Sequence, residues 1–231
     1  MRTFSGRLFR SRSSPAVWRT KIRDVELRNC NFMYCEILPA ATPRCRPLVQ
    51  DVLLIDSIVG SCQISTALIE DVVVDGLDTR GSGLWLYACA FRRVTVKGKV
   101  GSILIRDSNI PHQHSPKVEA RYRNANNAFF AKVDWALDIA AANARAIQIT
   151  GVPASLIRRD PESQVVVRRD KAEAGAWRGI AIEGIFQIAL QDLLKRKAED
   201  VVLVAPRQSP RFREYVADLE LLRRIGVAEP D

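Results

Sequence analysis

The stretch VLLIDSIVGSCQISTALIEDVVVDG, residues Val52–Gly76, divides without interruption into blocks of five residues. The third residue of every block is apolar, and the first is small or β-branched. This period matches neither the helical period of about 3.6 residues nor the strand period of about 2. It predicts a chain that turns a corner once per block, with the first and third side chains of each block facing inward. The inward residues are then Val52, Leu54, Ser57, Val59, Cys62, Ile64, Ala67, Ile69, Val72 and Val74.

Four such sides would complete one coil, so Val72 is expected directly above Val52. Successive coils would lie about 4.8 Å apart and pair their backbone N–H and C=O groups. Because the enclosed space is narrow, one inward position has to stay small while the other supplies the apolar bulk. The pattern therefore predicts a mainly β fold made of stacked parallel strands.

Similar blocks occur elsewhere, namely VELRN, CNFMY and CEILP at Val25–Pro39 and CAFRR at Cys89–Arg93. Together they resemble the pentapeptide-repeat family of right-handed quadrilateral β-helices. The repeats are degenerate, since Val or Ile often replaces the small first residue and the second residue is rarely Asn or Asp. The resemblance implies a right-handed parallel β-helix of about five coils, or a closely related short β-helix, with a helical carboxy-terminal cap region.

The chain is expected to have three parts. Residues 1–24 form a basic lead-in that covers the open first coil. Residues 25–156 form the β-helix, with an excursion from its wall at residues 113–135. Residues 157–231 form an α-helical region with two short strands, at Val165–Val167 and Val201–Val204. Its helices are expected from Ile182 to Leu194, where apolar residues recur at helical spacing, and from about residue 210 to residue 225.

The outward apolar residues Leu53 and Val73 should not face water, and such a patch requires a cover. We therefore expect one carboxy-terminal helix to lie along this side of the coils.

The net charge of +9 is concentrated near the amino terminus. Residues 1–24 contain a single acid, Asp24, against the basic residues Arg2, Arg7, Arg10, Arg12, Arg19, Lys21 and Arg23. The composition of residues 1–23 resembles an organelle-targeting presequence. We favour the alternative of an ordered lead-in.

The cysteines indicate a reducing compartment. Cys30, Cys35, Cys62 and Cys89 occupy inward first positions, where free thiols fill space, and only Cys45 lies outside the frame. An odd number of mostly buried thiols favours a cytoplasmic location. No apolar run approaches the roughly 20 residues of a membrane helix.

No metal or cofactor is expected. Cys30 and Cys35 have no His near them and lack zinc-site spacing. His112 and His114 have a spacing that can chelate a metal on a strand, but without a third ligand a solvated loop is the better interpretation.

Outward side chains of consecutive coils should stack into ladders. The third side would carry Gln63, then Trp85 and Tyr87, then Leu104 and Arg106, and the fourth side would place Glu70 and Asp71 beside Arg92 and Arg93. Aromatic residues beside arginines are enriched at protein interfaces and also stack on single-stranded nucleic acid. The candidate partner surface is therefore Trp85, Tyr87, Arg92, Arg93 and Arg106. In the alternative interpretation, the excursion covers the two aromatic residues and Arg92 and Arg93 pair with Glu70 and Asp71.

No phosphate-binding glycine loop, zinc spacing or Ser-His-Asp order indicates an enzyme. The group Asp75, Asp78 and Arg80 would suit a β-helix carbohydrate-active enzyme, although Asp is also common near turns. We expect a non-catalytic protein-binding or scaffold protein, with a protective or immunity-type role among its options. The alternative is a nucleic-acid-binding protein that uses the basic amino terminus and the face of arginines and aromatic residues.

Overall fold

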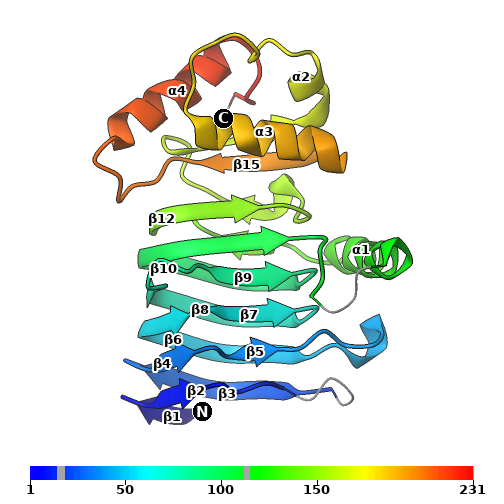
Figure 1. Ribbon diagram of the computed structural model, residues 1–231, viewed down its shortest axis with the longest axis vertical. Helices are drawn as coiled ribbons and strands as arrows, with labels where there is room; N and C mark the ends of the chain where they lie inside the picture. Colours follow the sequence, from blue (N-terminus) through cyan, green and yellow to red (C-terminus); the bar gives the residue numbers. More distant parts are fainter. Residues whose placement is uncertain (15–18, 112–114, 231) are drawn as a thin grey trace.

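The computed structural model describes residues 1–14, 19–111 and 115–230. Its strands are stacked side by side along the long axis of the molecule, and they form a sheet that curls on itself (Figure 1). The expected mainly β, parallel fold is confirmed, since the strands pair in parallel except at β15, which is antiparallel to β12 and β14. The strands are β1 (Arg2–Ser5), β2 (Leu8–Arg10), β3 (Lys21–Arg28), β4 (Asn31–Met33), β5 (Glu36–Ile37), β6 (Leu48–Gly60), β7 (Cys62–Ser65), β8 (Leu68–Asp78), β9 (Leu84–Tyr87), β10 (Ala90–Arg106), β11 (Leu137–Asp138), β12 (Ala142–Ile149), β13 (Ile157–Arg158), β14 (Gln164–Arg168) and β15 (Asp200–Val204).

The backbone turns at the fifth residue of each block. These corner residues have left-handed backbone conformations, with φ from 45° at Asp56 to 76° at Gly76. Gly, Asp and Asn adopt this conformation most readily, which explains why Asp and Gly hold most of the corners. The corners around the central stretch are Asp51, Asp56, Ser61, Thr66, Asp71 and Gly76.

The register follows the predicted stacking. Val52 pairs with Val72, which lies 20 residues further along the chain, and Val72 pairs with Val94. The step from Val72 to Val94 is two residues longer because of the insertion at Ser82 and Gly83. The same side chains therefore face inward in each layer despite the interruptions.

The inward cysteines satisfy backbone carbonyls as well as filling space. The Cys62 thiol donates to the carbonyls of Gly60 and Phe32, and the Cys89 thiol donates to those of Tyr87 and Ile64. Each therefore bonds the residue two positions earlier and a residue of the preceding layer. All five cysteines are free, and Cys45 is exposed as expected.

The amino-terminal segment lies along the edge of the first layer. There β1 pairs in parallel with β3, and β2 pairs in parallel with β4, so the segment adds a further incomplete layer. Its outer edge carries the exposed side chains of Phe4 and Leu8. The segment thereby satisfies backbone groups along the edges of β3 and β4.

The carboxy-terminal helices lie at the far end of the stack (Figure 1). They are α2 (Arg169–Glu173), α3 (Gly184–Arg196) and α4 (Phe212–Arg224), and they enclose a second core with β14 and β15 around Phe186, Leu190 and Leu219. The hypothesis of a helix along Leu53 and Val73 is wrong, since α2 packs on β14 and α3 on β15. Leu53 and Val73 are partly exposed and lie side by side in neighbouring strands.

The excursion from the wall contains a helix that was not predicted, α1 (Pro116–Phe130). Tyr122 in α1 is fully buried against Ala88 and Ile110, and its hydroxyl donates to the carbonyl of Ala40. The loop that contains the short 3₁₀ helix η1 (Pro43–Cys45) and Arg46 lies under this helix. A second 3₁₀ helix, η2 (Ala154–Leu156), precedes β13. Within the described ranges, no helix has the length and apolar character needed to cross a membrane.

Candidate functional site

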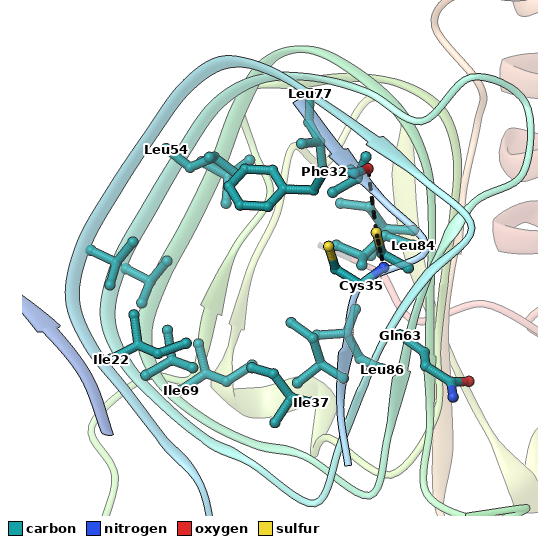
Figure 2. Close-up of a pocket in the computed structure, with 18 of the residues that line it drawn as sticks. Ile22, Phe32, Cys35, Ile37, Leu54, Gln63, Ile69, Leu77, Leu84 and Leu86 are labelled. Carbon is teal, nitrogen blue, oxygen red and sulfur yellow. Dashed lines mark hydrogen bonds between the residues drawn. The ribbon is translucent and has the colours of Figure 1, made fainter. Parts of the chain in front are cut away.

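One wall of the curled sheet carries a continuous ladder of outward side chains. Backbone pairing sets Glu36 beside Gln63, Gln63 beside Trp85, Trp85 beside Leu104, and Leu104 beside Gln148. The Gln63 side chain extends away from the interior (Figure 2). On the same face, Tyr87 pairs with Arg106. We call this surface the aromatic face; it consists of Gln63, Trp85, Tyr87, Leu104, Arg106 and Gln148.

The two aromatic residues of this face form a stacked pair. The rings of Trp85 and Tyr87 are 5.9 Å apart with an interplanar angle of 7°, and both side chains are partly exposed. Within the described residues, neither the Trp85 indole N–H nor the Tyr87 hydroxyl forms a hydrogen bond. Desolvation raises the pKa of Tyr87, so its hydroxyl stays protonated and available as a donor. The pair offers a rigid apolar surface with two unused polar groups.

The three arginines of the predicted partner surface lie on two different walls of the curled sheet. Arg106 lies on the aromatic face, where it donates to Gln148 and to Asp192 of α3. Arg92 and Arg93 lie on the adjoining wall and pair with Glu70 and Asp71.

Arg92 and Arg93 of β10 therefore form ion pairs with acidic residues of the neighbouring strand β8, as in the alternative interpretation. The two hydrogen bonds that Arg93 donates hold the pKa of Asp71 below its usual value, outweighing partial desolvation.

The excursion does not close over the aromatic pair. Asn126 in α1 donates to the carbonyls of Ala88 and Cys89 and accepts a hydrogen bond from Arg46. The helix is thereby fixed at the corner next to the aromatic face. Trp85 and Tyr87 keep their partial exposure.

A groove borders the aromatic face on the side of α3. It has a volume of about 190 Å³ and is lined by Arg106, Gln148 and Asp192 together with Ile185 and Ile188 of α3. The side chain of Ile188 is 62% exposed, and that of Ile185 is 38% exposed. An apolar strip therefore continues the aromatic face across the Arg106–Asp192 ion pair.

Other candidates from the sequence do not come together. Asp75 pairs with Lys97 and Asp78 with Arg80, and neither carboxylate lines the groove. His112 and His114 lie outside the described residues. Among the residues that are described, no group of three or more His, Cys, Asp and Glu side chains is arranged to hold a metal ion.

Two features of the surface and interior were not predicted. Ile185 and Ile188 of α3 are exposed, although they lie within Ile182–Leu194, the segment that was predicted as a helix from the spacing of its apolar residues. The interior cavity described below also has no signal in the blocks, because the pattern fixes which side chains face inward but not how completely they fill the space.

Comparison with known proteins finds no matching family model and no matching curated protein.

Proposed function

We propose that this chain is a non-catalytic protein-binding scaffold, built on a short right-handed β-helix of the pentapeptide-repeat type, with the aromatic face as its partner surface. Three observations support the β-helix: left-handed corners at every fifth residue, a 20-residue register between Val52 and Val72, and inward first and third positions. Such a wall is stiff, because each layer is hydrogen-bonded to the next over most of its length.

The observation that carries the binding proposal is that Arg106 adjoins both Tyr87 of the stack and the groove lined by the exposed isoleucines of α3. Protein interfaces are enriched in aromatic residues and arginine, and their centres are more apolar than the remaining surface. Arg106 lies between the stack and the isoleucines, where its ion pair with Asp192 is partly shielded from water. An apolar strip with an oriented arginine favours a folded protein partner over a charged polymer.

The proposal is tested by crosslinking and affinity capture from the native host. We expect a partner captured by the wild-type chain to be lost with the double variant Trp85→Ala and Tyr87→Ala. Tyr34→Ala is the matched control, because Tyr34 is an exposed aromatic residue that is not part of the aromatic face. Tyr87→Phe removes only the hydroxyl and should weaken capture without affecting folding. Equal capture by the double variant and the control would overturn the proposal.

A second candidate function is nucleic-acid binding, and it is supported by the amino-terminal arginines. Arg2, Arg7, Arg10 and Arg12 are exposed, and within the described residues none of them forms an ion pair. Binding through such groups would weaken steeply with salt, since phosphate contacts release counterions. Retention on single-stranded DNA at low salt that is abolished by Arg7→Gln and Arg10→Gln would favour this candidate over the first.

A further inference from the structure

The interior of the curled sheet is not completely filled. A cavity of about 430 Å³ lies between its walls, and apolar side chains from opposite walls point into it (Figure 2). Protein interiors normally contain few voids larger than a water molecule. Small-molecule sites measure roughly 300–1,000 Å³. The space is therefore of ligand size rather than a packing defect. Among its lining residues are Ile22, Phe32, Leu54, Ile69, Leu77 and Leu86.

The cavity is long and narrow. Its lining extends from Phe9 in β2 to Leu137 in β11. These strands are connected through β4, β6, β8 and β10 by five successive pairing steps. At about 4.8 Å per step, the lined length is about 24 Å. This shape suits an extended chain better than a compact ring system.

The amino-terminal end is the mouth of the cavity. Along one inner wall, Ile105 and Leu86 are buried, whereas Ile64 and Ile37 nearer the amino terminus are partly exposed. The register places these residues one above another in that order. Solvent accessibility therefore increases toward β2, where the rings of Phe9 and Phe32 stack 4.8 Å apart.

Most polar lining residues lie at this mouth and in the adjacent layer, namely Arg12, Ser13, Ser14 and Glu36. The deeper layers contribute aliphatic and aromatic side chains, with Cys62 and with Gln63, whose side chain extends away from the interior (Figure 2). Arg12 is exposed, and within the described residues its guanidinium forms no ion pair. Glu36 borders the same mouth, but it belongs to the outward ladder, where it pairs with Gln63. A site with apolar walls and polar residues at one end matches a molecule that has a long apolar part and a single polar end.

We propose that the interior binds one long-chain fatty acid, with its hydrocarbon chain along the axis of the stack and its carboxylate at the mouth beside Arg12. Burying the chain transfers its methylene groups from water into an apolar space, which is the main driving force of binding. Arg12 orients the head group, and the solvated mouth limits the cost of holding its charge. This inference is independent of the partner surface proposed above.

The proposal is tested with cis-parinaric acid, a linear polyene fatty acid whose fluorescence rises in apolar surroundings. We expect saturable binding to the purified full chain, displacement by oleic acid, and no displacement by cholesterol. Val74→Phe places a ring in the cavity and should weaken binding by about tenfold or more, since the ring displaces ligand methylenes. Val73→Phe is the matched control, because Val73 precedes Val74 on β8 but does not line the cavity. It should leave binding within about threefold of the wild type.

Further variants and controls test the role of Arg12 at the head group separately from binding of the hydrocarbon chain and from protein folding. Arg12→Gln should weaken displacement by oleic acid several-fold and leave displacement by oleyl alcohol unchanged. Circular-dichroism melting checks that Val74→Phe remains folded, and filling a void should not lower its melting temperature. Absence of saturable binding to the wild type would overturn the proposal, as would equal binding by folded Val74→Phe. Binding retained by the double variant Trp85→Ala and Tyr87→Ala would show that this site is separate from the partner surface.

Discussion

Arg106 in β10 forms an ion pair with Asp192 in α3, with 2.6 Å between Nη1 and Oδ2. This pair joins the curled sheet to the carboxy-terminal helical region, and both side chains are largely shielded from water. It also fixes the guanidinium next to Tyr87 on the aromatic face.

Replacing Asp192 with Asn should destabilise the chain by about 1–2 kcal/mol, since the charge-assisted hydrogen bonds from Arg106 and Arg196 are weakened at a partly buried position. Urea unfolding followed by circular dichroism measures the change. The matched control is Asp78→Asn, which breaks the pair with Arg80 where both side chains are more than half exposed. That control should change stability by less than about 0.5 kcal/mol. Equal effects of the two variants would contradict the structural role of the Arg106–Asp192 pair.

Removing the amide of Asn126 should destabilise the chain by about 2–4 kcal/mol, because Arg46 would keep a buried charge without its hydrogen-bond acceptor. Arg46 is 2% exposed, and its guanidinium lies 5.0 Å from the centre of the Tyr122 ring. Burial lowers the pKa of Arg46, consistent with the cost of charge at this position. Asn124→Ala, an exposed change on the same helix, serves as the control. Similar stability losses for the two alanine variants would show that Arg46 does not depend on Asn126.

The thiols should differ widely in reactivity. Burial raises the pKa of Cys89 to about 12 and also raises that of Cys62, whereas Cys45 is exposed. The thiolate is the reactive form, so iodoacetamide at mildly alkaline pH should modify Cys45 and spare Cys62 and Cys89 in the folded chain. Peptide mass spectrometry gives the extent of modification at each site. Modification of Cys89 as fast as Cys45 would show that the interior is open to water at this layer.

The Arg93–Asp71 pair should make stability depend on acidity. The folded-state pKa of Asp71 lies below its usual value of 3.8. Its stabilising contribution is therefore present above that value and is lost as the pH falls through the lower, folded-state pKa. Arg93→Gln should reduce stability at neutral pH, and the difference from the wild type should vanish in strong acid. An NMR titration of the Asp71 carboxyl, in which the variant shows the higher pKa, provides the direct reading.

Much of the stacking of strands in the curled sheet could be predicted from the sequence. The 20-residue spacing of Val52 and Val72 predicted their stacking. The ladder of Gln63, Trp85 and Leu104 followed from the same counting. Local spacing determines these features, because each block repeats the same corner geometry.

Tertiary features were less predictable. The helix α1 was missed although Ser115 and Pro116 form a suitable start, because its buried side chains are only Tyr122, Asn126 and Phe130, which make a weakly apolar face. The groove beside Arg106 depends on contacts between α3 and the strands β10 and β12, which lie far from α3 in the sequence. The cavity depends on the summed volumes of side chains from every wall, which no block pattern specifies.

Along each strand, side chains alternate between facing inward and facing outward. The aromatic face and the interior cavity both require that the left-handed corner in every block of five residues shifts this alternation by one residue. A cysteine scan of residues 52–59 in a Cys45→Ser background tests this most directly, with the labelling rate of each introduced thiol as the readout. We predict slow labelling at positions 52, 57 and 59 and fast labelling at positions 53, 55, 56 and 58, since the corner at Asp56 shifts the alternation by one residue. Strict alternation through the corner, with position 56 protected and position 57 reactive, would contradict the account.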